Sequence, residues 1–289
     1  MNGREHLDFY LSRRNATPDR VAEVIRNFGI AVLPEYLPKS FVSSLIAEYV
    51  DFFGCSDLAT FDSSSGNGTI RSVKAQVLAD AGSRFENWTA MFRHDFLARC
   101  VASYCHSMNL EIPATAINEK FEVEHNDQMG PSKNSGLHFD RVASIKVITY
   151  LNDVTEGGGG LRAVPRSHYH TKLFALEQFK TNPNPLCLQN FLVDEADLRM
   201  PVSTVSAPAG TIIFLDTFCL HAGGSLSRRL KRSVIRGVTW MRPMTDALLL
   251  SGITETQRAK LNEIVLPNFH HPYPLDANIS LHPEAMYTR

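Results

Sequence analysis

The sequence predicts a mainly β protein with flanking helices, in which the helices pack around one jelly roll. Apolar side chains recur at helical spacing in the first hundred or so residues, and short β-rich runs separated by Gly, Pro and Asn replace them after about residue 115. Several short strands joined by tight turns are typical of a sandwich or barrel and not of a parallel α/β sheet. With no internal repeat and no interdomain linker, we expect a single domain over 1–289, with a helical part at about 17–104, a jelly-roll core at about 115–242 and a C-terminal helix and tail at 243–289.

Two amphipathic helices with a short strand between them open the chain. Thr17 can cap a helix, Pro18 suits its first turn, and Gly29 ends it after apolar residues at helical spacing. The apolar run at 30–33 predicts a buried strand. A second amphipathic helix is expected from about 38 to 54.

The rest of the chain predicts one more long helix and then the strands. Residues 54–70 are rich in turn formers and predict a long surface loop, either a lid or a plain connection. Phe85–Tyr104 has helical spacing, the insert at 170–200 carries a short helix at Leu173–Phe179, and the tail carries another at Glu255–Ile264. The expected strands are Ser144–Leu151, Gly160–Val164, Thr204–Ala207, Thr211–Asp216 and Ser233–Trp240.

Composition excludes several classes of partner. A formal net charge of -1 and a pI near 6.8 give no electrostatic reason to expect nucleic acid or an anionic membrane surface as a partner. No signal-peptide pattern opens the chain, and no apolar run reaches the roughly 18 residues of a membrane span. The five cysteines are odd in number and contain no C-x-x-C, as expected of reduced thiols in the cytoplasm. We therefore expect a cytoplasmic protein with a small-molecule substrate; the oligomeric state is left open.

Three residues suggest a metal centre. His138 and Asp140 are two positions apart, so on a strand their side chains leave the same face. A His-x-Asp tripeptide alone is common by chance, but His221 follows the buried run at 211–215 and supplies a second imidazole. Two histidines and one carboxylate are the ligand set of non-haem iron oxygenases, and they leave three positions of an octahedral ion open. We interpret these three residues as metal ligands and as the catalytic set.

A basic segment follows the distal histidine. A guanidinium matches a carboxylate in two parallel hydrogen bonds, so an arginine one strand step beyond His221 can receive a dicarboxylate. Arg228, Arg229 and Lys231 are better explained as a solvated basic turn. Arg232 and Arg236 have the same strand parity, so chemistry alone does not decide between them.

The ordered set of motifs resembles the phytanoyl-CoA dioxygenase family of Fe(II)/2-oxoglutarate-dependent oxygenases. The resemblance runs from about Val21 to Met241 and covers VIRNFGIAVLPEYLPKSFVSSLI, HFD, YLNDVTEGGGGLRAVPRSH and APAGTIIFLDTFCLHAGG. It departs from the family at 165–168, where Pro-Arg-Ser-His replaces a frequent Pro-Gly-Ser-His, and at Gly223, where some members have serine.

The resemblance implies a double-stranded β-helix, the cupin-like form of the jelly roll. It implies that Fe(II) is held by His138, Asp140 and His221, that Arg232 anchors the distal carboxylate of 2-oxoglutarate, and that O2 is the third cofactor. The implied reaction is hydroxylation of an unactivated C–H bond with release of succinate and CO2, although desaturation, epimerisation and cyclisation share the same core. An aspartate at position 140 argues against a halogenase, which leaves that position free for halide.

Two alternatives from other classes stay open: a cupin-like metal enzyme that does not use 2-oxoglutarate, and a catalytically silent jelly-roll binding protein. Substrate identity is not indicated. The residues that could line a mouth above the iron, each of which also has a structural explanation, are Arg141, Tyr150, Arg166, His168 and Trp240.

Overall fold

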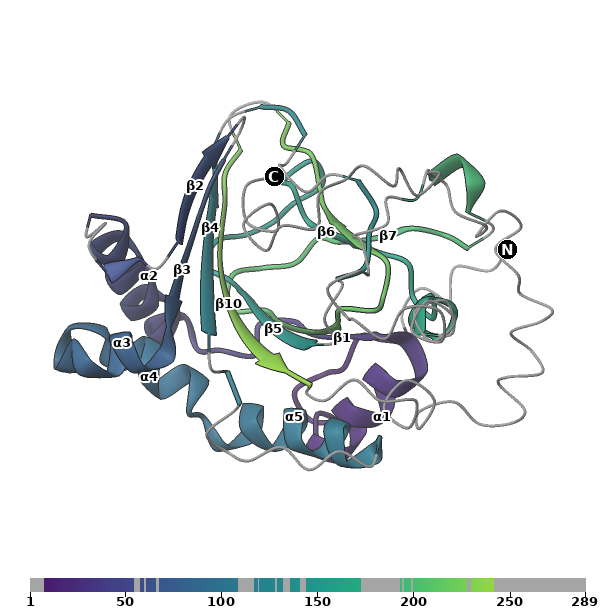
Figure 1. Cartoon of the computed structure of the whole chain (residues 1–289), viewed down its shortest axis with the longest axis horizontal. Helices are drawn as coiled ribbons and strands as arrows, with labels where there is room; N and C mark the ends of the chain where they lie inside the picture. The colour runs from purple at the N-terminus through teal and green to yellow at the C-terminus, as the bar shows by residue number, and fades with distance from the viewer. Residues whose placement is uncertain are drawn as a thin grey trace, which may run out of the picture.

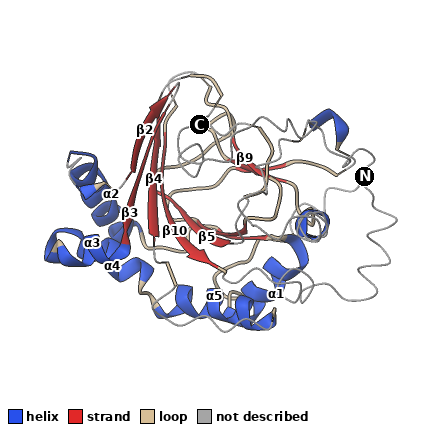
Figure 2. Cartoon of the chain, in the orientation of Figure 1, coloured by secondary structure: helices blue, strands red, loops and turns tan. Residues whose placement is uncertain are grey.

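The computed structural model contains two antiparallel sheets and a layer of helices against the larger one (Figure 1, Figure 2). It describes residues 8–54, 58–59, 61–65, 68–108, 117–118, 120–127, 129–131, 136–140, 144–172, 193, 195–198, 200–227 and 230–241. Within these ranges, the larger sheet has the strand order β1 (Ile30–Leu33), β8 (Ile212–Asp216), β5 (Ser144–Tyr150), β10 (Arg232–Trp240), β4 (Lys120–Asn126), β3 (Gly68–Lys74) and β2 (Phe61–Ser65). The smaller sheet has the order β7 (Ser203–Val205), β6 (Leu161–Ala163) and β9 (His221–Gly223). The predicted fold class, mainly β with flanking helices, is confirmed.

The helices cover one face of the larger sheet. Tyr49 of α2 donates a hydrogen bond to the Glu124 carbonyl of β4 at 3.2 Å, and the ring of Phe92 of α4 stacks on Phe121 of β4 at 4.3 Å. Figure 1 shows α1 and α5 together beside the sheet, with α2, α3 and α4 near β2 and β3. The helices and 3-10 turns are α1 (Pro18–Phe28), α2 (Lys39–Gly54), α3 (Ala75–Asp80), η3 (Gly82–Phe85), α4 (Glu86–Phe92), α5 (Asp95–Ser107) and η6 (Glu195–Asp197).

The first helix and strand form as predicted. The Thr17 side chain accepts a hydrogen bond from the Arg20 backbone at the start of α1, and Gly29 ends the helix at a φ of 76°, a left-handed conformation that favours glycine. A β-carbon at Gly29 would lie 2.7 Å from Nδ1 of His168, so there is also no space for a side chain. The chain then enters β1, which pairs with β8.

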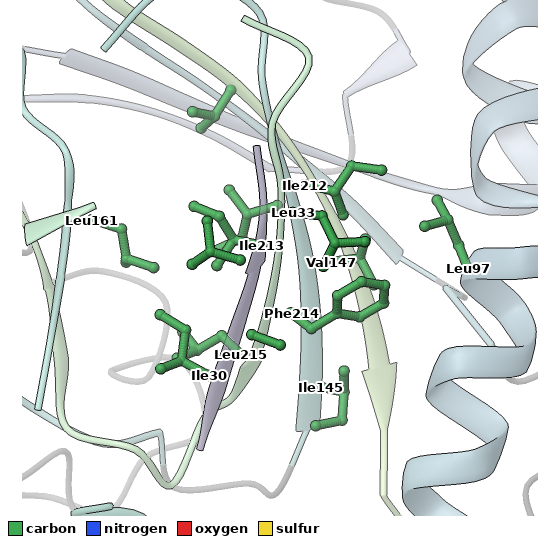
Figure 3. Close-up of a cluster of buried hydrophobic side chains, with 14 of the residues drawn as sticks. Ile30, Leu33, Leu97, Ile145, Val147, Leu161, Ile212, Ile213, Phe214 and Leu215 are labelled. Atoms are coloured by element: carbon green, nitrogen blue, oxygen red, sulfur yellow. The ribbon is translucent and has the colours of Figure 1, made fainter. Parts of the chain in front are cut away.

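Strand register divides the larger sheet into an apolar outer face and an inner face that carries charges. Residues directly opposite in an antiparallel ladder lie on the same face. The outer face includes Val147 and Phe214, which lie toward Leu97 of α5, while Ile213 and Leu161 lie on the opposite side of the strands (Figure 3). The inner face of β5, β10 and β4 carries the register-matched sets Lys146–Val238–Lys120, Ile148–Arg236–Glu122 and Tyr150–Val234–Glu124.

Two predictions about the helical half are wrong in part. The expected loop at 54–70 contains β2 and the start of β3, because β4 supplies a partner for β3 that the turn-rich composition does not reveal. The expected single helix at Phe85–Tyr104 is two helices, since Arg93 ends α4 and the His94 side chain accepts a hydrogen bond from the Phe96 backbone at the start of α5.

The five strands predicted after residue 115 are all present, at β5, β6, β7, β8 and β10, whereas β4 and β9 in the same part of the chain were not predicted. The helices expected at 173–179 and 255–264 lie outside the described residues. In the part of the chain that the structure describes, no helix has the length and apolar character needed to cross a bilayer.

Candidate metal centre

The backbones of the three predicted ligands are joined to one another by hydrogen bonds. His138 and His221 form an isolated antiparallel bridge, in which each backbone N–H donates to the other carbonyl at 3.0 and 2.8 Å. The Asp140 N–H donates to the Thr217 carbonyl at 2.9 Å. The turn between β8 and β9 therefore fixes all three residues, and His138 needs only this bridge, not the regular strand that the His-x-Asp spacing suggested.

The three side chains converge on one point. Their potential ligand atoms all lie within 4.8 Å of one another. Oδ1 of Asp140 is 3.8 Å from Nε2 of His138 and 3.7 Å from Nε2 of His221. In each histidine Nδ1 lies 2.8 Å from a backbone carbonyl, that of Gly136 or Cys219, which can only accept a hydrogen bond. The proton therefore resides on Nδ1, and both Nε2 lone pairs face Asp140.

Electrostatics keep Asp140 and His221 in their metal-binding protonation states. Burial opposes ionisation of Asp140, but the Lys146 ammonium, 2.6 Å from Oδ2, and the two imidazoles outweigh it and hold the pKa of the carboxyl well below its usual range. Burial, together with the neighbouring His138, lowers the pKa of His221 to about 3. An ionised carboxylate and neutral imidazoles are the forms that bind metals. Because Lys146 holds Oδ2, Oδ1 is the oxygen left for an ion.

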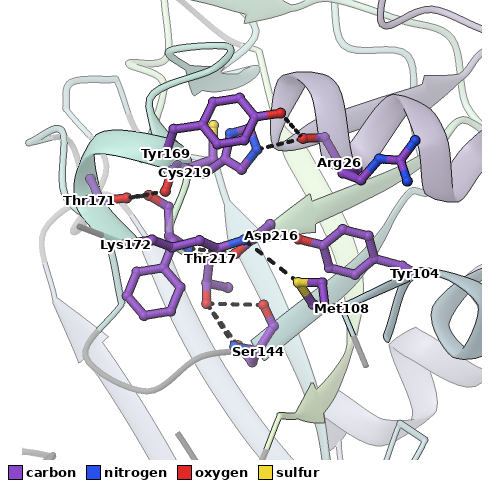
Figure 4. A network of polar contacts seen from close by, with 12 residues as sticks. Arg26, Tyr104, Met108, Ser144, Tyr169, Thr171, Lys172, Asp216, Thr217 and Cys219 are labelled. Carbon is purple, nitrogen blue, oxygen red and sulfur yellow. Dashed lines mark hydrogen bonds and ion pairs between the residues drawn. The ribbon is translucent and has the colours of Figure 1, made fainter. Parts of the chain in front are cut away.

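A fully buried polar network supports the turn that carries these ligands. Lys172 lies 2.6 Å from Oδ2 of Asp216, and the Tyr104 hydroxyl donates to the same oxygen at 2.5 Å (Figure 4). Oδ1 of Asp216 accepts the Phe218 N–H at 2.9 Å. The Thr217 hydroxyl contacts the Ser144 hydroxyl at 3.1 Å. The network therefore connects the start of the turn to α5, to β5 and to the segment at 164–172.

The predicted anchor Arg232 is buried on the inner face of β10. Its Nη1 donates to the Gly159 carbonyl and its Nη2 to Oε1 of Glu124. Its Nε is buried and has no hydrogen-bond partner among the described residues. Arg236 lies one step further along the same face, 3.0 Å from Oε2 of Glu124 and 3.7 Å from Oε2 of Glu122.

The predicted substrate residues occupy different environments. Tyr150 accepts the Leu161 N–H at 2.9 Å and donates to the Val205 carbonyl at 3.0 Å, so its hydroxyl joins the two sheets. His168 is buried against the Arg26 carbonyl at 2.9 Å. The remaining three are Arg166, exposed with its guanidinium 4.9 Å from the Phe28 ring centroid, Trp240 at the end of β10, and Arg141, which lies outside the described residues.

Sequence reasoning missed Lys146, Glu122, Glu124, Asp216 and Lys172. A signal was present for the first three. Lys146 interrupts an otherwise uncharged strand, and KFEVEHN at 120–126 alternates polar and apolar residues with the period of a strand. Lys172 and Asp216 are far apart in the sequence, and neither segment indicates that they pair.

No family model matches the chain, and no curated protein matches it. Solved structures do. The non-heme α-ketoglutarate-dependent epimerase SnoN from nogalamycin biosynthesis matches with a TM-score of 0.52 at 20% identity, over 80% of this chain and 88% of SnoN. The α-ketoglutarate-dependent carbocyclase SnoK, from the same biosynthesis, has a TM-score of 0.52 at 13% identity, over 83% and 93%. The dioxygenase for auxin oxidation from rice has a TM-score of 0.53 at 10% identity, over 86% and 88%.

At these identities the likeness shows the fold. The chain shares its fold with enzymes described as dependent on α-ketoglutarate, another name for 2-oxoglutarate, and SnoN has been solved with Fe3+ and α-ketoglutarate bound. The predicted fold class is confirmed a second time. Two imidazole nitrogens and one carboxylate oxygen, converging and correctly protonated, also fit a non-haem iron ion by their donor chemistry.

Proposed function

We propose that this chain is a non-haem Fe(II)/2-oxoglutarate-dependent dioxygenase of the phytanoyl-CoA dioxygenase family. Its proposed reaction is hydroxylation of an unactivated C–H bond of a small-molecule substrate, with release of succinate and CO2. The observation that carries the proposal is the convergence of Nε2 of His138, Nε2 of His221 and Oδ1 of Asp140, on a fold shared with α-ketoglutarate-dependent enzymes.

In this proposal each residue has a defined task. His138, Asp140 and His221 hold Fe(II), which when bound supplies oxygen activation with 2-oxoglutarate and O2 as cosubstrates. Arg232 pairs with the distal carboxylate of 2-oxoglutarate, because a guanidinium binds a carboxylate through two parallel hydrogen bonds. Lys146 keeps Asp140 oriented with one oxygen toward the ion. The buried position of both histidines keeps bulk water away from the centre.

The first experiment measures metal binding and turnover together. Purified protein is titrated with Fe(II) without oxygen and then supplied with 2-oxoglutarate and O2, while oxygen uptake and succinate are recorded. We expect one Fe(II) per chain and succinate formation even without substrate, at a slow uncoupled rate. Replacement of His138 by Ala should abolish both. Oxygen uptake without succinate would instead favour a metal enzyme that does not use 2-oxoglutarate, and absence of stoichiometric Fe(II) binding would favour a silent binding protein.

A panel of small molecules then tests the substrate. A true substrate raises succinate formation and yields a product with one added oxygen atom, whereas a product of unchanged oxygen content would indicate desaturation, cyclisation or epimerisation.

We further propose a cytoplasmic location. The described cysteines Cys100, Cys105 and Cys219 are buried free thiols, which are compatible with a reducing compartment.

A further inference from the structure

Glu124 lies between two arginines on the inner face of the larger sheet. In the β10–β4 ladder, Arg232 is opposite Asn126, Val234 is opposite Glu124, and Arg236 is opposite Glu122. The Glu124 carboxylate is therefore centred between the two guanidiniums. Oε1 of Glu124 accepts a hydrogen bond from Arg232, and Oε2 forms an ion pair with Nη2 of Arg236 at 3.0 Å, so the carboxylate bridges the two guanidiniums.

Among the residues that the structure describes, Arg232 does not have a complete set of hydrogen-bond partners. Five N–H bonds belong to a guanidinium, and those of Arg232 contact the Gly159 carbonyl and a single oxygen of Glu124. Its Nε has no hydrogen-bond partner within the described ranges, although the residue is only 4% exposed. An unpartnered buried donor on a cation costs free energy, and an anion is the acceptor that would stabilise it most.

Glu124 has other partners that can hold it if it leaves Arg232. Besides Arg236, the Asn126 amide donates to Glu124 at 2.6 Å. Burial opposes ionisation of Glu124, but the two arginines outweigh it and lower its pKa to about 2, so the group is a carboxylate at neutral pH. A carboxylate with two remaining donors can give up one arginine without becoming an isolated buried charge.

We propose that Glu124 is an internal carboxylate that pairs with Arg232 when cosubstrate is absent, and that the distal carboxylate of 2-oxoglutarate displaces it while Arg236 retains it. The inference rests on the proposed function and assigns Glu124 and Arg236 as residues that set cosubstrate affinity and selectivity. A 2-oxo acid that lacks the distal carboxylate leaves the Glu124–Arg232 pair intact, so its binding does not involve the exchange.

The test compares 2-oxoglutarate with 2-oxovalerate, which has the same keto-carboxylate end and no distal carboxylate. Both are titrated calorimetrically into the Fe(II)-loaded protein without oxygen. Glu124→Gln removes the competing charge, so it should tighten 2-oxoglutarate by about tenfold or more and leave 2-oxovalerate unchanged. Arg236→Met removes the group that retains Glu124, so it should weaken 2-oxoglutarate by about tenfold, again without effect on 2-oxovalerate.

Glu122→Gln is the matched control. Glu122 lies on the same strand and face, with Lys120 at 3.1 Å and Arg236 as its ion-pair partners, and makes no contact with Arg232 in the described residues. We expect it to leave the ratio of the two affinities at the wild-type value. A merely structural role for Glu124 would shift both ligands in the same direction, and that result would overturn the inference.

Two further measurements separate the possible failures. If the wild type binds neither 2-oxo acid, the proposed function fails and the inference fails with it. If the wild type binds 2-oxoglutarate and Arg232→Met weakens it, but Glu124→Gln behaves like Glu122→Gln, the proposed function stands and the inference is wrong. Should Glu124→Gln not fold, a crystal structure of the wild type with 2-oxoglutarate decides: Glu124 paired with Arg236 alone supports the exchange, and Glu124 still on Arg232 overturns it.

Discussion

At the scale of single residues, hydrogen bonds distinguish structural polar groups from groups available to a ligand. The Tyr150 hydroxyl uses its donor on the Val205 carbonyl and accepts from the Leu161 N–H. Burial raises the pKa of Tyr150 to about 12, so the phenol stays protonated under all ordinary conditions. Its capacity as a ligand contact is largely taken up by these two backbone groups, whereas Nε of Arg232 has no acceptor among the described residues.

Replacement of Tyr150 by Phe should therefore lower the stability of the fold more than the activity of the protein. Two buried backbone groups lose their partner, so the free energy of unfolding should fall by about 1–3 kcal/mol. Urea denaturation measures this, with Tyr36→Phe as control, since the Tyr36 hydroxyl makes no hydrogen bond among the described residues. A large rise in the KM of a substrate, with stability unchanged, would instead establish Tyr150 as a substrate contact, as the sequence suggested.

His168 gives a prediction about pH. Burial, followed by the nearby Lys172 ammonium, lowers its pKa to about 3, while an unfolded chain would protonate it near 6.5. Between these two pKa values the unfolded state binds a proton that the folded state does not bind, so the free energy of unfolding decreases as the pH falls from about 6.5 toward 3. The slope from this one residue is about 1.4 kcal/mol per pH unit.

The measurement is the free energy of unfolding of the metal-free protein at several pH values from about 7 to 4. His168→Gln keeps a donor for the Arg26 carbonyl but has no titrating ring, so its stability should fall less steeply with acid. The exposed His106, replaced by Gln, is the control and should follow the wild type. Parallel curves for His168→Gln and the wild type would show that His168 does not titrate in this range.

Residue patterns predicted part of the site and could not predict the rest. The triad and Arg232 could be predicted because the spacing of His138 and Asp140, the distal His221 and the motifs behind the family resemblance are visible in a linear chain. Glu124 was not found, because its role depends on the register of β4 against β10. Strand β4 itself was absent from the predicted elements, so the polar and apolar residues that alternate at 120–126 could not be placed opposite those of β10.

At the scale of elements, the geometry of the candidate metal centre depends on the turn between β8 and β9. Thr217 holds the Asp140 backbone, and His221 lies at the end of the turn, paired with His138. Asp216 fixes the start of this turn, because its carboxylate contacts Lys172 and Tyr104 in the interior (Figure 4). A disturbance at Asp216 should therefore be felt at the ligands.

Replacement of Lys172 by Met tests this dependence. It leaves the Asp216 carboxylate buried without its cation, so the free energy of unfolding should fall by about 3–5 kcal/mol. Adding Asp216→Asn removes the uncompensated charge and should restore part of the loss, which a double-mutant cycle measures. The exposed pair of Arg20 and Glu23 is the control, since Arg20→Met should cost no more than about 1 kcal/mol. Equal losses of stability in Lys172→Met and Arg20→Met would contradict a special role for the buried pair.

The elements also show where local signals are sufficient. Helix α1 was predicted correctly because Thr17, Pro18 and Gly29 each act within a few residues of their own position. The hairpin of β2 and β3 was missed, since its stability comes from pairing with β4, a segment roughly fifty residues away that composition alone does not reveal. Local chemistry thus predicts helix ends better than it predicts strand partners.

At the scale of the whole molecule, the helical layer and the apolar outer face of the larger sheet leave the inner face free to carry charge. Lys146, Arg232 and Arg236 lie on that face, together with the carboxylates that neutralise them. The organisation as a single domain remains a prediction. Because the ligands come from segments far apart in the chain, an ion bound to all three should stabilise the entire fold.

Metal binding should accordingly raise the thermal stability of the whole chain. A ligand that binds only the folded state adds about 2.7 kcal/mol at one hundred times its dissociation constant. In a protein of this size that corresponds to a rise in Tm of several degrees. Thermal unfolding is followed by circular dichroism without oxygen, with and without Fe(II), and with Mn(II) as an ion that is less easily oxidised. His138→Ala should lose the rise, whereas His168→Gln, altered outside the triad, should keep it. An equal rise in His138→Ala would mean that the ion binds elsewhere, and the assignment of the triad as the metal centre would be wrong.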